Sequence, residues 1–246
     1  MRFFISIMII VAMTWIFTMP CSSNDFEKDI FITINGTLEI SFIKHGTLMF
    51  KYNKMIIHVD PSIRYTDYSK LPKADLILIT HKHGDHLDTA AIKLVSTPKT
   101  RIIASPDCSE KINNENILKN GESSMIDRIK IETVPAYNIV HERRKGIPYH
   151  PKGDGNGYIL NFGDFRVFVA GDTENIPEFK ELKNIKIAFL PMNLPYTMTP
   201  EMVANGALMF KPEILYPYHY GETDTSELLK LMKDNKDTEV RIRQLQ

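Results

Sequence analysis

Six residues, HKHGDH, constrain this chain more than any other stretch. They span His81–His86 and contain three of its eight histidines. They directly follow "DLILIT", residues Asp75–Thr80, a continuous aliphatic run that predicts a short buried strand. Because alternate side chains of a strand share one side, His81 and His83 project together. Gly84 then lets the backbone turn sharply. The stretch therefore predicts a cluster of imidazoles just beyond the end of a strand.

The second half of the motif adds a carboxylate and another imidazole. Asp85 and His86 fall on the turn, ahead of a helix-like stretch from Leu87 to Val95. Imidazole and carboxylate together suit zinc and similar divalent ions, whereas calcium or magnesium would require more oxygen ligands. A histidine-rich surface loop is the alternative. The strand before the motif and the glycine inside it favour a metal site.

The pattern HxHxDH resembles the signature of the metallo-β-lactamase superfamily, and three further landmarks occur in that family's order. Asp60 closes the strand-like "MIIHVD", Asp172 lies in "FRVFVAGDT", and His219 follows "PEILYPY". Together with the motif they span most of the chain. The branch it resembles is that of the ascorbate-phosphate lactonase-like, metal-dependent hydrolases. The resemblance implies an α/β (α+β) fold, the four-layer αβ/βα sandwich.

The resemblance also implies a site with two divalent ions, two zinc ions by expectation, with manganese or iron as alternatives. Asp85, as a ligand or beside the metal-bound water, and Asp60, as support that fixes a ligand histidine, are the catalytic candidates. By the resemblance, the first ion would be held by His81, His83 and His150. The second ion would be held by Asp85, His86 and His219. The carboxylate of Asp172 would bridge the two ions.

One landmark of the family is off-pattern. A metal-binding histidine often follows a proline-alanine pair in this branch, and here that place is occupied by Asn138. His141 lies in the charged run "HERRK", which is typical of a solvated face. His150 lies between Tyr149 and Pro151 and is favoured as the missing ligand by the family's ligand count. Asn138 would then either orient a ligand or touch substrate.

The other candidate residues have weaker support. His45, beside Gly46, is expected at a hairpin corner, and His58 is expected inside a strand as a core histidine near Asp60. Neither is assigned to a metal.

Substrate contacts are expected from Asn138, Tyr218 and Lys152. Tyr218 and its neighbour Tyr220 either line the cleft or pack, and Lys152 and Arg143 either meet an anionic substrate or stay solvated.

Composition narrows the class of partner. Thirty basic residues balance thirty acidic ones, and the chain has no basic stripe with interleaved aromatics. This argues against a nucleic-acid-binding protein and favours a small-molecule substrate. The length of 246 residues suits one domain. Oligomeric state is left open.

The N-terminus differs in kind from the rest. Arg2 precedes an apolar stretch from Phe3 to Met19, which predicts a secretory signal. The expected organisation is a signal peptide at 1–20, a polar tether at 21–29 and a hydrolase domain at 30–246. Cys21 lies where a lipidated cysteine would, although the preceding "FTMP" departs from the usual small residues. The protein is expected to be exported, as a periplasmic protein or a lipoprotein attached to a membrane. Cys108 is expected to be a structural thiol.

Strand-like and helix-like segments alternate along the remaining chain. Strands are expected at 31–35, 38–45, 48–52, 55–60, 101–104, 129–134, 185–190 and 213–218, with a hairpin at 158–170, and helices at 87–95, 106–113, 199–210 and 225–234. Thr199 and Pro200 suit an N-cap and a first helical position. The long loop 136–157 is expected to form a wall of the substrate cleft.

These features predict a metal-dependent hydrolase, binuclear by expectation, which uses a metal-bound hydroxide on an ester, lactone or phosphodiester bond. The chain contains no GxSxG serine motif. The alternative is an exported, non-catalytic metal-binding or ligand-binding protein of the same fold, for which Asn138 in place of histidine is the best support.

Overall fold

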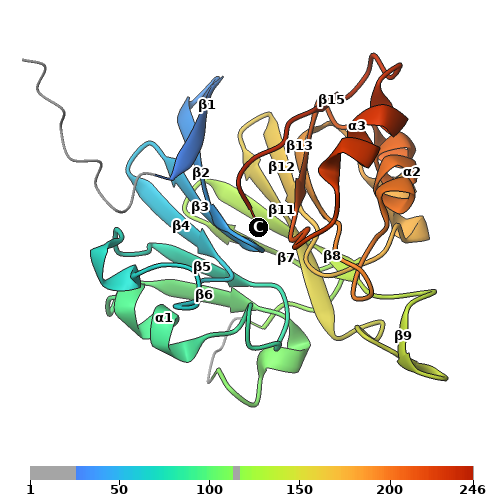
Figure 1. Cartoon of the computed structure of the whole chain (residues 1–246). Helices are drawn as coiled ribbons and strands as arrows, with labels where there is room; N and C mark the ends of the chain where they lie inside the picture. The colour runs from blue at the N-terminus through green and yellow to red at the C-terminus, as the bar shows by residue number, and fades with distance from the viewer. Residues whose placement is uncertain (1–25, 113–116, 246) are drawn as a thin grey trace, which may run out of the picture.

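A computed structural model describes residues 26–112 and 117–245, so the predicted signal peptide and Cys21 lie outside the described residues. Two β-sheets pack face to face, with helices on the outer side of each (Figure 1). The first sheet holds, in spatial order, β1 (Glu27–Thr33), β2 (Gly36–Lys44), β3 (Thr47–Tyr52), β4 (Met55–Val59), β5 (Leu76–Ile79) and β6 (Arg101–Ala104).

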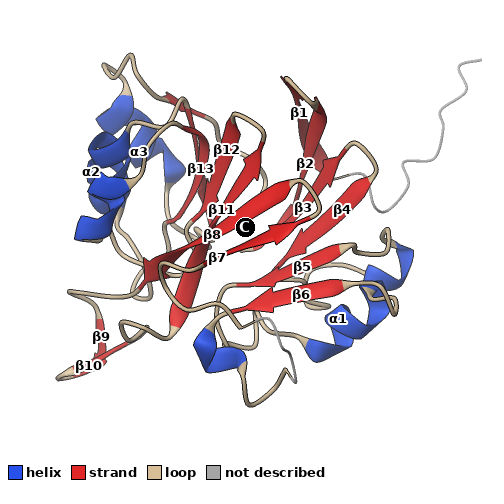
Figure 2. Cartoon of the chain, turned by 180° about the vertical axis from the view of Figure 1, so that it is seen from behind, coloured by secondary structure: helices blue, strands red, loops and turns tan. Residues whose placement is uncertain are grey.

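The second sheet is formed by the other half of the chain. Its spatial order is β15 (Glu239–Val240), β14 (Ile214–Tyr218), β13 (Ile185–Pro191), β12 (Phe165–Val169), β11 (Gly155–Phe162), β8 (Ile129–Ala136) and β7 (Ser123–Ile126). A small hairpin of β9 (Glu142–Arg144) and β10 (Ile147–Pro148) projects from the body (Figure 2).

The helices complete the four layers. Helix α1 (Thr89–Val95) lies outside the first sheet, and α2 (Pro200–Phe210) and α3 (Thr225–Met232) lie outside the second (Figure 2). Three short 3-10 helices connect strands: η1 (Tyr68–Lys70), η2 (Pro106–Cys108) and η3 (Pro177–Glu181). The layering is the predicted αβ/βα sandwich. Among the residues described, no helix has the length and apolar character needed to cross a membrane.

Strand β5 shows how the sequence specifies this layering. All four of its residues, "LILI", are buried because both faces of the strand are covered. Leu76 and Leu78 join the core between the two sheets. Ile77 and Ile79 point to the opposite side and pack with the buried residues of α1. A continuous aliphatic run is therefore required here instead of an alternating one.

Two predicted helices differ from the observed ones at their ends. Helix α1 begins at Thr89 and not at Leu87, because the Asp88 side chain caps the backbone amides of Ala90 and Ala91. The predicted helix 106–113 is only the short η2, where burial raises the pKa of the Cys108 thiol to about 12. For α2 the prediction is confirmed, since Thr199 accepts a hydrogen bond from the amide of Met202.

Two predicted loops also contain strands. Strand β1 begins at Glu27, inside the stretch expected to be a tether, and its Asp29 is bound by the guanidinium of Arg243 at 2.7 Å. The loop expected at 136–157 contains β9 and β10, and β11 already begins at Gly155. These strands are short or lie at sheet edges, so they leave little alternation in the sequence.

The topology brings several strand ends together. Strands β4, β5 and β6 run parallel, as do β12, β13, β14 and β15. Carboxyl ends of parallel strands lie at one edge of a sheet, and both sheets present this edge to the same region. The polar residues after β4, β5, β12 and β14 are thereby gathered at one place.

Candidate metal centre

Six segments supply the polar side chains of this region. Asp60 follows β4, His81 and His83 follow β5, Asp172 follows β12 and His219 follows β14. The turn between β2 and β3 and the segment after β10 each add one histidine: His45 and His150. The structure thus brings together every side chain that the sequence assigned to a metal.

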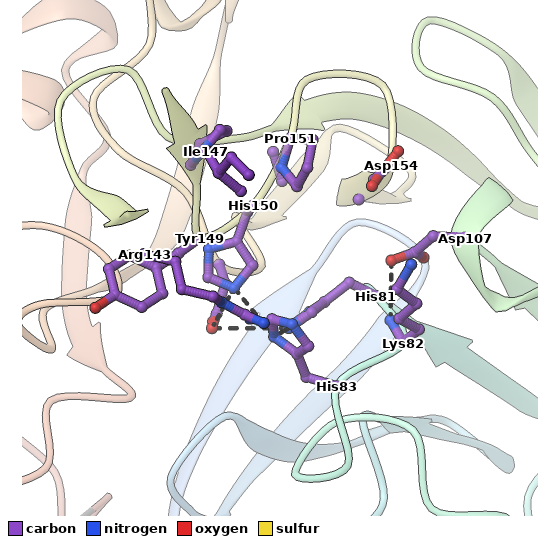
Figure 3. A pocket seen from close by; sticks show the side chains of 14 residues that line it. His81, Lys82, His83, Asp107, Arg143, Ile147, Tyr149, His150, Pro151 and Asp154 are labelled. Carbon is purple, nitrogen blue, oxygen red and sulfur yellow. Dashed lines mark hydrogen bonds and ion pairs between the residues drawn. The ribbon is translucent and has the colours of Figure 1, made fainter. Parts of the chain in front are cut away.

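The first group of donors is His81, His83 and His150. Nε2 of His81 lies 3.0 Å from Nδ1 of His83, and Nε2 of His150 lies 3.3 Å from the same atom. Figure 3 shows the His150 ring directed toward the other two. Two imidazole nitrogens on one tetrahedral zinc are roughly 3.3 Å apart, since each Zn–N bond is about 2.0–2.1 Å. The spacing of this group fits a shared cation.

The second group contains Asp85, His86 and His219. Oδ2 of Asp85 lies 3.7 Å from Nε2 of His86 and 3.7 Å from Nε2 of His219. Asp172 lies between the two groups: Oδ2 is 3.4 Å from His150 and 3.6 Å from His219, and Oδ1 is 3.6 Å from His86. Its position agrees with the bridging role that the family resemblance implied.

Several donor atoms of these groups are buried without a hydrogen-bond partner in the part of the chain described. They include Nε2 of His86, Nε2 of His219 and Oδ1 of Asp172. A buried polar atom without a partner costs about 1–3 kcal/mol, and such atoms are rare in folded proteins. Three of them directed into one space are explained by a ligand that accepts lone pairs. A divalent cation is such a ligand, so the donor set fits a metal.

The charge states of the donors suit the same ligand. Burial lowers the pKa of His150 to about 4 and lowers that of His81 well below its ordinary value, so both imidazoles are neutral at pH 7. Burial opposes ionisation of Asp172, but His219 and His86 outweigh it and hold the pKa of its carboxyl well below the usual range. Neutral imidazole and ionised carboxylate are the forms that bind metals.

Asp60 fixes the orientation of His86 from behind. Its buried carboxylate accepts hydrogen bonds from the amide and hydroxyl of Thr80, at 2.8 and 2.6 Å, and from Nδ1 of His86 at 2.8 Å. A proton of His86 is therefore on Nδ1, and Nε2 faces the centre. Burial opposes the charge of His86, but the carboxylates of Asp172 and Asp60 outweigh it and raise the pKa of this imidazole to about 10, so a bound cation would displace the proton from Nε2. Asp60 thus has the position that its predicted supporting role requires.

Asn138 has the corresponding role for His150. Its amide oxygen accepts from Nδ1 of His150 at 2.7 Å and from the His150 backbone amide at 2.9 Å. Asn138 is buried and does not line the cleft. Of the two roles left open for it, the structure favours the orientation of a ligand over contact with substrate.

His141 is placed differently from the prediction. Its side chain is 22% exposed, and its Nδ1 lies 2.8 Å from the buried carboxylate of Glu174. The charged run around His141 is solvated. The His141 side chain itself turns inward, because it forms a hydrogen bond with the buried carboxylate of Glu174. Neither His141 nor Glu174 belongs to a donor group. Nothing in the sequence pointed to Glu174 except its position two residues after Asp172.

His45 is a site residue that the sequence interpretation missed. It lies at the predicted hairpin corner, but its Nε2 is 3.4 Å from Oδ2 of Asp85, and its ring centroid is 3.7 Å from that of His219. Its donor atom clusters with the second group. The only available signal was the histidine-glycine pair, since Gly46 leaves the space into which His86 and His219 fit.

Backbone strain is concentrated at this centre. His45, Asp60 and His219 have φ values of 56°, 47° and 49°, in the left-handed region that residues with a side chain rarely adopt. Each such residue costs of order 1–3 kcal/mol and persists only where its surroundings fix it. Here the strain directs three polar side chains toward one point.

Two other predictions are corrected by the structure. Tyr218 is fully buried and packs on Phe189 with ring centroids 5.9 Å apart, so it belongs to the core and not to the cleft. Lys152 is exposed and pairs with Glu178 at 2.7 Å, away from the cleft. The prediction for His58 is confirmed: it is a buried histidine inside β4, and its Nε2 donates to the carbonyl of Pro72 at 3.1 Å.

A cleft opens on both sides of the donors. One hollow, of about 190 Å³, lies between the first donor group and the segment 147–151, and includes Arg143, Ile147 and Pro151 (Figure 3). A wider hollow reaches Arg64, Asp85 and His219 on the other side. Loop 136–157 therefore forms a wall of the cleft, as predicted.

Comparisons with known proteins agree with this geometry. A model of the beta-lactamase superfamily domain matches residues 39–219. A UPF0173 metal-dependent hydrolase of Thermococcus kodakarensis is 29% identical over 218 residues, which cover 81% of this chain and 94% of the relative.

Solved structures give the same result. A candidate metal-dependent hydrolase from Parabacteroides distasonis is 53% identical, with a TM-score of 0.86 over 90% of this chain and 100% of the other. YhfI of Bacillus subtilis, a metallo-beta-lactamase fold protein, is 14% identical, with a TM-score of 0.61 over 81% of this chain and 88% of the other, and shows the fold alone. The chain belongs to the beta-lactamase superfamily and has the metallo-β-lactamase fold. Within that superfamily it groups with the metal-dependent hydrolases.

Proposed function

We propose that the protein is a binuclear metal-dependent hydrolase of a small-molecule ester, lactone or phosphodiester. The observation that carries this proposal is the position of Asp172. Its two oxygens lie 3.4–3.8 Å from imidazole nitrogens of both donor groups, including His150, His86 and His219. One carboxylate shared by two groups of donors supports two neighbouring ions over a single one.

Two divalent ions at this place would lower the pKa of water enough to supply a hydroxide nucleophile at neutral pH and would polarise the bond to be cut. The residues of the chain hold that chemistry in place. Asp60 and Asn138 fix the tautomers of His86 and His150, so that each presents a lone pair to the centre. Asp85, with 29% of its side chain exposed, lies where the second group meets the cleft.

Zinc is our proposal for both ions. The donors are imidazoles with few carboxylates, which suits zinc better than calcium or magnesium. Manganese and iron accept the same donors, so metal analysis of the purified protein has to decide among the three. The first group offers three protein donors, which leaves a coordination position for water or substrate, as catalytic zinc sites do.

The lining of the cleft supports a small molecule as substrate. Arg143 and Arg64 line it, and neither forms an ion pair within the described residues. The arginines that do form ion pairs there are Arg166, Arg241 and Arg243. We propose no nucleic-acid partner, because the thirty basic and thirty acidic residues balance and the sequence contains no basic stripe.

The test combines metal content with turnover. Purified protein should contain about two ions per chain, and hydrolysis of generic p-nitrophenyl esters, lactones and bis-(p-nitrophenyl) phosphate should stop after chelation and return with added metal. The competing function is a non-catalytic binding protein of the same fold. A metal-replete protein that is inert toward all three substrate classes would favour that alternative. Its best support is Asn138 in place of a histidine, and the position of His150 beside His83 supports the hydrolase instead.

We also propose that the protein is exported, as a periplasmic protein or a lipoprotein attached through Cys21. The apolar stretch from Phe3 to Met19 after Arg2 supports this proposal. Expressed in a bacterium with its own N-terminus, the protein should lose about twenty residues, and acylation should appear as added mass on Cys21. An intact Met1 in the cytosolic fraction would contradict export.

A further inference from the structure

We propose that Glu174 is the positioning residue of the first donor group: through Asn138 it fixes the tautomer and the direction of His150. This inference rests on the proposed metal site. Glu174 itself touches neither the donors nor the cleft, and its side chain is fully buried. Its action therefore passes through other residues.

The contacts of the Glu174 carboxylate are unusual in number. Oε2 accepts from the backbone amides of Ile139 and Val140, each at 2.8 Å, and Oε1 accepts from the amide of His141 at 2.7 Å. Three successive amides directed at one carboxylate form an anion-binding concavity of the kind seen at helix N-termini. The carboxylate thus fixes the backbone of the loop at 139–141.

Two side chains complete the carboxylate's hydrogen bonds. Nδ1 of His141 lies 2.8 Å from Oε1, and Nδ2 of Asn138 lies 3.1 Å from the same oxygen. The segment is anchored on the backbone as well, because the amide of Glu174 donates to the carbonyl of Tyr137 at 3.0 Å. The loop therefore has no freedom to rotate Asn138 away from its partners.

Glu174 acts on His150 through the orientation of the Asn138 side-chain amide. Its NH2 group faces two acceptors, Oε1 of Glu174 and the carbonyl of Tyr196 at 2.9 Å. A flipped amide would place its oxygen against these two oxygens, so the oxygen must face His150. An amide oxygen only accepts hydrogen bonds, and the proton of His150 is therefore held on Nδ1. The lone pair of Nε2 is left facing His83 and Asp172.

This arrangement explains why a buried carboxylate lies two residues after Asp172 although no lysine or arginine among the described residues pairs with it. The strand end that carries the shared carboxylate also anchors the loop that supplies His150. The same rigid segment therefore positions both Asp172 and His150, and it fixes the distance of 3.4 Å between Oδ2 of Asp172 and Nε2 of His150. Supporting partners of this kind are typically worth 10–100-fold in metal affinity.

The test is Glu174→Gln, with Glu178→Gln as the matched control. Glu178 is a carboxylate four residues along the chain that pairs with Lys152 and Tyr137 and makes no hydrogen bond to Asn138 or His150 among the described residues. Zinc affinity is measured by competition with a chromophoric chelator, and the His150 tautomer by long-range nitrogen-proton NMR on metal-free protein. We expect Glu174→Gln to lose about 10–100-fold in affinity at the first group and to populate both tautomers. Glu178→Gln should match the parent in both measurements.

A Glu174→Gln protein that binds zinc like the parent and keeps His150 protonated on Nδ1 would overturn the proposal. Loss of thermal stability alone, without a change in either measurement, would show a merely structural role and would also overturn it. If the parent itself binds no metal, the proposed function fails, and the tautomer measurement still decides this inference. Should Glu174→Gln not fold, Asn138→Leu serves instead, because it removes the amide link while the three backbone amides still bind Glu174.

Discussion

The side-chain oxygen of Asn138 lies 2.7 Å from Nδ1 of His150. The backbone N–H of Asn138 also donates a hydrogen bond to the backbone carbonyl of His150 at 2.9 Å. Twelve residues separate them in the chain. The loop between them carries the β9–β10 hairpin and closes on itself through this pair. An asparagine thus stands directly behind an imidazole donor.

His150→Ala should remove one of three imidazoles from the first donor group. The ion there would keep only His81, His83 and the shared Asp172, so we expect the affinity to fall by more than about 100-fold, beyond the range typical for loss of a supporting residue. Chelator competition measures this directly. Lys152→Ala is the control, because Lys152 pairs with Glu178 outside the cleft. Equal zinc affinity in His150→Ala and the parent would exclude His150 as a ligand.

Asp85→Asn should affect the second donor group alone. The change keeps the shape of the side chain and removes the charge that lies near His86, His219 and His45. Metal content should fall from about two ions per chain to about one, with activity reduced, while the thermal unfolding temperature of the metal-free protein stays within a few degrees. Elemental analysis after dialysis is the measurement. Unchanged stoichiometry and turnover would remove Asp85 from the site.

Gly171→Ala should destabilise the fold next to Asp172. Gly171 has φ +67°, and a Cβ there would lie 2.8 Å from the backbone oxygen of Asn156. Backbone strain and the clash together should cost about 3 kcal/mol. Gly121→Ala is the control, since Gly121 has φ +84° with open space around it and reports the strain alone. Urea unfolding of both variants gives the difference, and equal losses would mean that the clash is relieved at no cost.

His58 should make stability depend on pH independently of the metal. Burial lowers its pKa to about 4, so the folded protein keeps it neutral while the unfolded chain takes up a proton below pH 6.5. Its contribution is complete above pH 6.5 and is lost as the pH falls toward 4. Between pH 7.5 and pH 5 this amounts to about 2 kcal/mol of unfolding free energy.

The measurement for His58 is urea unfolding of metal-free protein, because metal binding depends on pH and would add its own contribution to the free energy of unfolding. His58→Gln keeps a donor for the Pro72 carbonyl and removes the titrating group. Its stability should fall less between pH 7.5 and pH 5, by about the same 2 kcal/mol. Parallel pH profiles for the variant and the parent would show that His58 is protonated in the folded state.

The local pattern of the sequence determined the fold and most of the donors. The aliphatic run before His81 predicts a strand covered on both faces, and β5 is buried on both faces. Thr199 predicts the start of α2, and its side chain caps that helix. Both features depend on residues a few positions apart, where backbone geometry alone decides the outcome. The order of Asp60, Asp172 and His219 after strand-like runs indicated the site in a different way, through the resemblance to the metallo-β-lactamase family.

Tertiary structure alone decided which residues join these donors and which leave them. His45 reaches Asp85 across forty residues of chain, and Glu174 reaches Asn138 across thirty-six. Tyr218 falls in the core although its neighbour His219 enters the site, because successive positions at a strand end face opposite ways. Contacts of this kind depend on how the two sheets pack and on which hydrogen-bond donors the fold brings to a buried carboxylate. The spacing of residues along the chain determines neither of these, so the contacts can be seen only in the folded structure.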